Sequence, residues 1–119
     1  MAQSNSGFIY KIATAAAWED FRASGRFPGM PVDIKDGYVH FSTAAQLGET
    51  LRLHFAGQGG LVVFAVRADA LGDDLRWEPS RGGQLFPHLY GDLPFAAVGD
   101  HAAIEVGADG SVDLPGWVQ

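Results

Sequence analysis

The hydrophobic pattern of the first third of the chain predicts short strands and one helix. Residues 8–12 are a candidate strand, and residues 15–24 predict a helix that Thr14 can cap. Residues 32–34 predict another strand, which would pair with residues 38–41 across a Lys-Asp-Gly turn. This part of the chain therefore predicts a strand, a helix and a hairpin.

A second helix and a central strand give the clearest periodic signals. Residues 44–55 predict a helix whose apolar residues lie on one stripe, namely Ala44, Leu47, Leu51 and Phe55. Residues 61–66 are apolar at every position, and a strand buried on both faces has this pattern. We expect this strand to lie in the middle of a sheet.

The second half of the chain predicts an aromatic loop and several short strands. Residues 86–91 hold Phe, Tyr, Pro and Gly, which is typical of a rigid loop, and Trp117 is expected to pack back on the domain. Two early helices among many short strands indicate an α+β fold in one domain, with residues 1–7 as a flexible start. The later strands are expected at residues 75–78, 95–98 and 102–106.

Composition excludes several classes of protein. Hydrophobic residues make up 47% and charged residues 18% of the chain, which is typical of a globular protein. Eight basic and fourteen acidic residues give a net charge of -6, so we expect no broad nucleic-acid surface. Cysteine is absent, and neither a signal peptide nor a membrane-spanning run is recognisable. We expect a soluble cytoplasmic protein without a membrane partner.

Residues 36–46 carry the most chemical character in the chain. As a strand, residues 38–42 would place Tyr38, His40 and Ser42 on one face, and Thr43 would then cap the following helix. A polar strand face beside a helix N-terminus is suited to an anionic or hydrogen-bonding ligand. The alternative is a structural role, in which His40 is a half-buried histidine bonded to a backbone carbonyl.

Other catalytic arrangements have weaker support. No two histidines have short metal-site spacing and no cysteine assists them, so we expect no metal ion. A metal site or hydrolase built on His40 and His88, with Glu78, would require the fold to bring these residues together. Residues 86–91 either fill one end of the core or form the wall of a cleft, with His88 and Tyr90 offering polar tips.

Motifs spread over nearly the whole chain resemble a bacterial family called domain of unknown function 952. The most specific are Asp-Gly-x-x-His-x-Ser-Thr at residues 36–43 and Phe-Pro-His-Leu-Tyr-Gly at residues 86–91. Weaker matches are residues 10–12, Trp18 and residues 75–78. The resemblance extends from about residue 8 to residue 115 and implies no settled activity.

The family is in turn similar in fold to the ADP-ribosyltransferases, and most closely to the RNA 2′-phosphotransferases. This similarity implies an ADP-ribosyltransferase-like fold, a split sheet with mixed or antiparallel strands, and NAD as the cofactor held in a cleft. The His-x-His-Leu-Ser strand of the phosphotransferases resembles residues 38–42. Lys11, however, stands where a histidine would bind the NAD ribose, and the usual catalytic glutamate has no counterpart. We therefore expect a ligand-binding cleft like that of these enzymes, but not their reaction.

Three hypotheses follow from these observations. In the first, a cleft binds a nucleotide-like small molecule of the NAD or ADP-ribose type, with His40 as the acid–base catalyst of an NAD-linked transferase. In the second, the domain is not an enzyme and binds a protein or peptide. In the third, it is an unrelated hydrolase or metal-dependent enzyme. The ligand-binding residues expected under the first hypothesis are Lys11, Tyr38, Ser42, Thr43, Arg52, Glu78, His88 and Tyr90.

Overall fold

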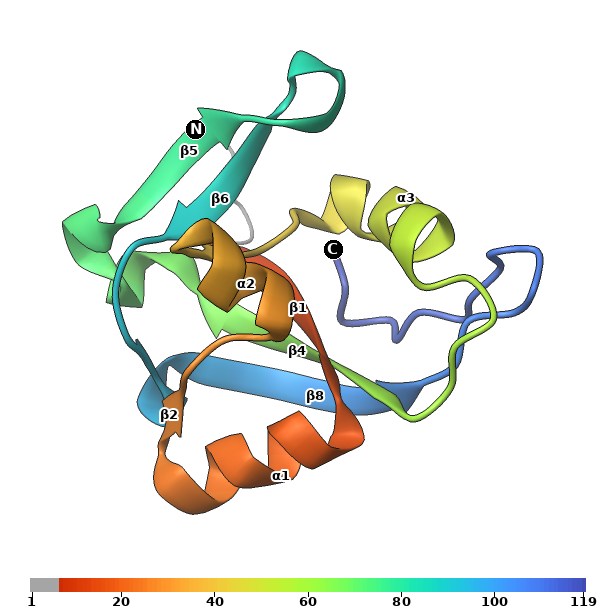
Figure 1. The fold of residues 1–119 in the computed structure, drawn as a ribbon, viewed down its shortest axis with the longest axis horizontal. Helices are drawn as coiled ribbons and strands as arrows, with labels where there is room; N and C mark the ends of the chain where they lie inside the picture. The colour runs from red at the N-terminus through yellow and green to blue at the C-terminus, as the bar shows by residue number, and fades with distance from the viewer. Residues whose placement is uncertain (1–6) are drawn as a thin grey trace.

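The central sheet consists of three antiparallel strands in the order β1–β4–β8 (Figure 1). These are β1 (Phe8–Thr14), β4 (Leu61–Arg67) and β8 (Val98–Ile104), in a computed structural model that describes residues 7–119. Strand β4 is buried at every position except its last, so the prediction of a central strand at residues 61–66 is confirmed. Its all-apolar sequence suits this position because both faces of the strand are covered.

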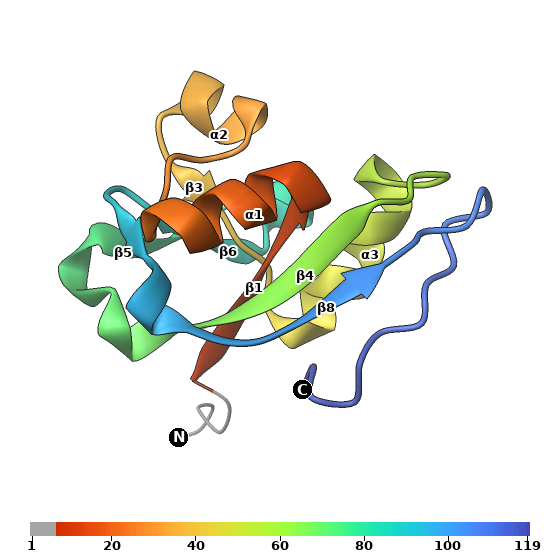
Figure 2. The same cartoon turned by 90° about the horizontal axis from the view of Figure 1, so that it is seen from below.

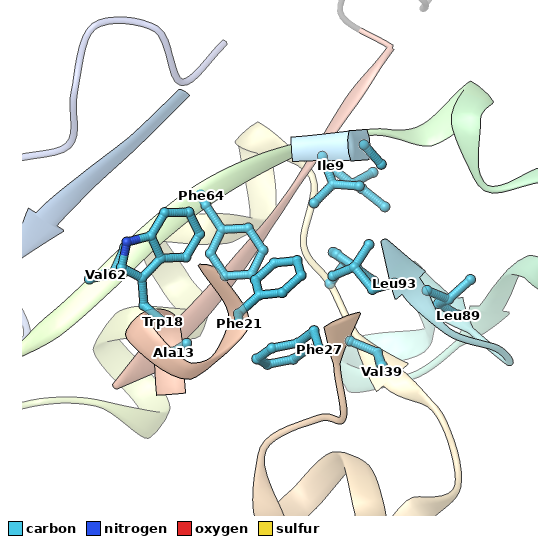
Figure 3. Close-up of a cluster of buried hydrophobic side chains, with 13 residues drawn as sticks. Ile9, Ala13, Trp18, Phe21, Phe27, Val39, Val62, Phe64, Leu89 and Leu93 are labelled. Carbon is cyan, nitrogen blue, oxygen red and sulfur yellow. The ribbon is translucent and has the colours of Figure 1, made fainter. Parts of the chain in front are cut away.

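Helices α1 (Ala15–Ser24) and α3 (Ala44–His54) cover opposite faces of this sheet (Figure 1). Alternate side chains of β4 point to the two faces, so each helix packs on its own hydrophobic cluster. On the α1 side, Trp18, Phe21 and Phe64 pack together (Figure 3). On the α3 side, Leu47 and Leu51 are fully buried, as the predicted stripe requires.

Both helices begin where local chemistry predicted. The Thr14 hydroxyl accepts a hydrogen bond from the backbone N–H of Ala17 (3.1 Å). The Thr43 hydroxyl accepts one from the backbone N–H of Gln46 (3.2 Å), and the Gln46 side chain accepts from Thr43 in return (3.0 Å). Such caps satisfy amides that have no partner inside the helix, and a capped start is therefore encoded locally.

A second antiparallel sheet has the order β3–β6–β5 and carries the aromatic motif. Its strands are β3 (Val39–His40), β6 (Leu85–Leu89) and β5 (Leu75–Pro79). Two backbone hydrogen bonds between Tyr10 and Ser42, of 2.8 and 2.9 Å, join this sheet to β1. A small pair, β2 (Arg26–Phe27) with β7 (Leu93–Pro94), completes the strands in the described part of the chain.

The predicted hairpin of residues 32–34 with residues 38–41 is wrong. Residues 32–34 lie in a short helix, α2 (Pro31–Asp36), and β3 pairs with β6 instead. Proline is favoured in the first turn of a helix because its missing N–H is not needed there. The carboxylate of Asp33 also accepts from the Met30 backbone N–H (2.7 Å), which stabilises the helix start.

Three further expectations need correction. The segment at residues 86–91, expected to be a loop, lies largely in strand β6, where Pro87 is opposite Trp77. Of residues 95–98, expected to form a strand, Phe95–Ala97 form a 3₁₀ turn and only Val98 lies in a strand. The last strand covers Val98–Ile104, earlier than the predicted residues 102–106. In the first and third cases, pairing between distant strands decided the structure and local pattern did not.

The C-terminal segment runs back beside α3 (Figure 2), and the Trp117 ring stacks on Tyr10 at 6.3 Å, as expected. The observed architecture is α+β with antiparallel sheets and three α-helices among the described residues. None of those helices has the length and apolar character that crossing a membrane requires. The first six residues, most of the start that was expected to be flexible, lie outside the described part.

Candidate functional site

A cavity of about 460 Å³ lies where α3, β1 and the second sheet meet. Apolar side chains such as Ile12, Phe55 and Phe86 form part of its wall. The polar and charged side chains that line it include Lys11, His40, Ser42, Thr50, Arg81 and His88. This mixture of apolar wall and few polar groups is typical of small-molecule sites.

Asp33 organises one side of the cavity. Its carboxylate accepts hydrogen bonds from Lys11 Nζ (3.0 Å), from the His40 backbone N–H (3.0 Å) and from Met30. His40 Nδ1 lies 2.6 Å from the same carboxylate. Asp33 and Lys11 are both buried, so this ion pair is shielded from water. Lys11 is therefore committed to Asp33, although it lines the cavity.

The pKa values of this pair reflect burial and mutual attraction. Burial alone would raise the pKa of Asp33, but the His40 hydrogen bond and the Lys11 charge outweigh it and hold the pKa at about 2. Burial lowers the pKa of Lys11, and the neighbouring Asp33 charge opposes that change. Asp33 is accordingly ionised at neutral pH and acts only as a hydrogen-bond acceptor.

His40 is held between two carboxylates. Its Nδ1 contacts Asp33, and its Nε2 lies 3.0 Å from Asp36 Oδ2. A carboxylate only accepts hydrogen bonds when ionised, and an imidazole donates from both nitrogens only when it is doubly protonated. Both ring nitrogens of His40 are therefore in contact with carboxylates, and neither is left for a ligand.

His88 has a different arrangement. Its Nδ1 lies 2.7 Å from Glu78 Oε1, which also accepts a hydrogen bond from the Tyr90 hydroxyl (2.8 Å). The hydrogen bond from His88, followed by that from Tyr90, lowers the pKa of Glu78. The hydrogen bond to Glu78 in turn raises the pKa of Tyr90. The ring is buried, yet its Nε2 has no partner among the described residues. His88 lines the cavity, and Nε2 is the ring nitrogen that is left for a ligand.

Tyr38 covers both imidazoles from outside the cavity. Its ring stacks on His88 with centroids 4.2 Å apart and lies 4.5 Å from the His40 ring. The centroid of the Tyr90 ring lies 5.1 Å from that of Tyr38. Burial, with the charges of Asp36 and Glu78, raises the Tyr38 pKa, so its hydroxyl stays protonated.

Arg81 also lines the cavity and was not singled out from the sequence. Its Nη1 donates to the Thr50 hydroxyl (3.4 Å), which in turn contacts the Ser42 hydroxyl (3.1 Å). Its guanidinium lies 4.9 Å from the centroid of the Phe86 ring. Nη2 is the one buried side-chain nitrogen or oxygen in the described residues that has no hydrogen-bond partner. A buried donor in this state is costly unless an acceptor reaches it.

The structure brings several of the predicted residues together. Lys11, His40, Ser42 and His88 line the cavity, although they come from three different elements and the segment before α3. Tyr38, Glu78 and Tyr90 lie behind the two imidazoles and do not line it.

Two predicted ligand contacts lie outside the cavity. The Thr43 hydroxyl is engaged in the cap of α3. Arg52 pairs with Glu49 at 3.6 Å and packs on the turn at Gly110, away from the cavity lining. Sequence reasoning chose Thr43 to hold ribose or phosphate oxygens and Arg52 to neutralise a phosphate. In the structure, the helix cap and the pairing with Glu49 occupy these two side chains instead.

Three residues of the site were missed by sequence reasoning: Asp33, Thr50 and Arg81. Asp33 lay in a segment interpreted as a strand, although the Pro-x-Asp pattern at residues 31–33 is a signal for a helix start. Thr50 lies off the apolar stripe of α3, and Arg81 lies in a 3₁₀ turn (Arg81–Gly83) without any periodic signal. In the described part of the chain, no group of three His, Asp or Glu side chains is arranged to hold a metal ion.

The fold and the cavity define a class of protein, an α+β domain whose two antiparallel sheets meet beside a pocket with paired imidazoles. Within that class, the family model described as a protein of unknown function, DUF952, matches residues 12–101. The chain belongs to this family.

Solved structures of one relative are similar over most of the chain. The crystal structure of protein CC0527 from Caulobacter crescentus is 46% identical, with a TM-score of 0.84, and the match covers 89% of this chain and 93% of that one. Its solution structure is 47% identical, with a TM-score of 0.77 and coverage of 89% and 90%. No curated protein matches the chain.

Proposed function

We propose that the cavity binds an anionic, nucleotide-like small molecule. The observation that carries this proposal is the Arg81 guanidinium, whose buried Nη2 lacks an acceptor at the cavity wall. A phosphate or carboxylate group reaching this wall would supply the acceptor, and Arg recognises both groups through paired N–H donors. The hydroxyls of Thr50 and Ser42, already in contact with each other, lie beside it.

The rest of the cavity suits the uncharged part of such a ligand. Phe55, Phe86 and Val32 offer an apolar wall on which a flat ring can pack. The volume of about 460 Å³ lies within the range of roughly 300–1,000 Å³ for small-molecule sites. A nucleotide combines an anionic group with a flat aromatic base whose faces are apolar, and this chemistry matches the two parts of the wall.

The resemblance to ADP-ribosyltransferases makes NAD and ADP-ribose natural probes, but the residues do not fit the transferase reaction. Lys11, at the position of the ribose-binding histidine, is already paired with Asp33. Neither Asp nor Glu lines the cavity among the described residues, so a catalytic glutamate has no equivalent there. We propose binding of the anionic molecule and derive no transfer step with NAD.

Calorimetric titration of the purified protein with AMP, ADP-ribose and NAD tests this proposal. Arg81→Gln removes the cationic donor and should weaken binding roughly tenfold or more, because a charge-assisted hydrogen bond contributes about 1.5–3 kcal/mol. Arg52→Gln is the matched control, since Arg52 is an arginine outside the cavity. Equal affinities of both variants and the wild type would contradict the proposal.

Exposed apolar side chains favour a second candidate function, the binding of a peptide or protein. Trp77 and Leu85 are 46% and 51% exposed on the β5–β6 hairpin, which projects from the central sheet (Figure 1). Exposed apolar groups of this kind are a feature of interaction surfaces. Capture of a partner that is lost in Trp77→Ser but retained in Arg81→Gln would support this function over the first.

A further inference from the structure

We infer that His88, rather than His40, exchanges protons with the ligand, and that Glu78 is its positioning residue. The inference rests on the proposed anion-binding function and adds a proton acceptor to the same cavity. Both histidines line the cavity, and their ring centroids are 5.5 Å apart. The two rings differ in what their nitrogens contact, and this difference assigns the roles.

His40 has no free nitrogen with which to act. Asp33 lies 2.6 Å from Nδ1, and Asp36 lies 3.0 Å from Nε2. A ring that donates to two carboxylates carries protons on both nitrogens and has no lone pair for a further proton. Its role in the cavity is that of a fixed positive charge, with Asp33 setting its orientation.

His88 has the arrangement of a general base. Glu78 accepts a hydrogen bond from Nδ1–H at 2.7 Å, which favours the neutral tautomer with a lone pair on Nε2. A carboxylate that holds one imidazole nitrogen orients the ring and stabilises the imidazolium that forms on protonation. The hydroxyl of Tyr90, bonded to the same oxygen of Glu78, fixes that carboxylate in turn.

The step we infer is a single proton transfer. A hydroxyl of a ligand anchored at Arg81 loses its proton, so its O–H bond breaks and an N–H bond forms at His88 Nε2. The electron pair of the broken bond stays on the oxygen, and the positive charge gained by the ring faces Glu78. The ligand class is a phosphate- or carboxylate-bearing molecule that also carries a hydroxyl group.

Several charged or titratable groups surround His88 and affect the pH dependence of its protonation. Glu78 and Arg76 belong to the neighbouring strand β5, and Arg76 is the register partner of His88. His40 is its partner on β3, Tyr38 stacks on its ring, and Tyr90 acts through Glu78. The pH dependence measured for the wild type is therefore compared with that of the Glu78→Gln variant.

Long-range proton–nitrogen NMR of the histidine rings, near neutral pH, tests the assignment directly. Resonances are assigned with His40→Gln, His88→Gln and His101→Gln. We expect His88 as the Nδ1–H tautomer with a bare Nε2 and His40 with protons on both nitrogens. Glu78→Gln should reduce the preference of His88 for that tautomer, while the conservative Glu78→Asp should partly restore it. A doubly protonated His88, or a bare nitrogen on His40, overturns the inference.

A titration with inorganic phosphate as the probe then separates this inference from the proposed function. We expect the His88 Nε2 resonance to shift in the wild type and this shift to be lost in Arg81→Gln. Arg81-dependent binding of phosphate without a shift at His88 overturns the inference and leaves the binding function intact. Absence of phosphate binding contradicts the proposed function, while the tautomer measured without phosphate still decides which histidine has the free nitrogen.

Discussion

His40 and His88 are direct register partners on the antiparallel strands β3 and β6, with their ring centroids 5.5 Å apart. About two fifths of the chain separates them in sequence, and each is the histidine of one of the two motifs on which the resemblance to the family was based. Strand pairing thus places both motifs at one cavity. The cavity is the structural reason why we treat the two motifs as a single site.

The buried ion pair of Lys11 with Asp33 should contribute strongly to stability. Asp33→Asn leaves the Lys11 charge buried without its partner, so we expect a loss of about 3–5 kcal/mol in the free energy of unfolding. Asp36→Asn is the matched control at a partly exposed carboxylate, with an expected change of less than about 1 kcal/mol. Urea denaturation measures both values. Similar losses in the two variants would show that Asp33 has no special role.

The low pKa of Asp33 predicts how stability changes in acid. The folded pKa of about 2 lies below the ordinary value of 3.8, so the unfolded chain binds more protons between these values. The contribution, about 2 kcal/mol at 1.36 kcal/mol per pH unit, is present above pH 3.8 and is lost as the pH falls through 2.

Unfolding free energies measured between pH 2 and pH 5 check this window. The double variant Lys11→Met with Asp33→Asn removes both charges and should have a shallower pH dependence than the wild type. An equally steep dependence in the double variant would assign the acid sensitivity to other carboxylates, such as Glu78, whose pKa is also lowered.

Substitutions of Thr43 distinguish a structural role of its hydroxyl from a ligand-binding role. Its hydroxyl caps α3, so Thr43→Ala should reduce the free energy of unfolding by about 1 kcal/mol. Thr43→Ser keeps the hydroxyl and should restore most of that loss. Because Thr43 does not line the cavity, nucleotide affinity should not change in either variant. A drop in affinity that exceeds the change in stability would return Thr43 to the ligand site.

Tyr90 should act on the site through Glu78. Tyr90→Phe removes the hydrogen bond to Glu78 Oε1 but keeps the ring beside Tyr38. One of the two hydrogen bonds that lower the pKa of Glu78 is then lost, and this pKa should rise toward its ordinary value. Carbon-detected NMR titration of the Glu78 carboxyl in both proteins measures it. An unchanged pKa would mean that His88 alone controls the carboxylate.

The sequence predicted those parts of the fold that local chemistry determines. The continuous apolar run of β4 and the threonine caps of α1 and α3 depend on neighbouring residues, and they were found where expected. Helix α2 was missed because Val32 and Ile34 alternate with polar residues as in a strand, although both side chains are exposed in the structure. Proline at the first helical position was the stronger signal.

The site was predicted only in part, for a related reason. The motifs identified His40 and His88, but the groups that distinguish the two rings come from other elements. Asp33 reaches His40 from α2, and Glu78 reaches His88 from β5 across a strand pair. Arg81 follows no periodic pattern, and only the packing around it reveals a buried donor without a partner. These contacts form only in the tertiary structure, so the sequence pattern alone does not predict them.

The central claim is that an anion binds at Arg81 within the cavity. Amide and arginine side-chain NMR spectra of the wild-type protein during titration with AMP test it most directly. We expect saturable shifts at Arg81 Nε and at the amides of Ser42, Thr50 and His88, all abolished in Arg81→Gln. Shifts confined to the β5–β6 hairpin around Trp77, or equal shifts in wild type and Arg81→Gln, would contradict it.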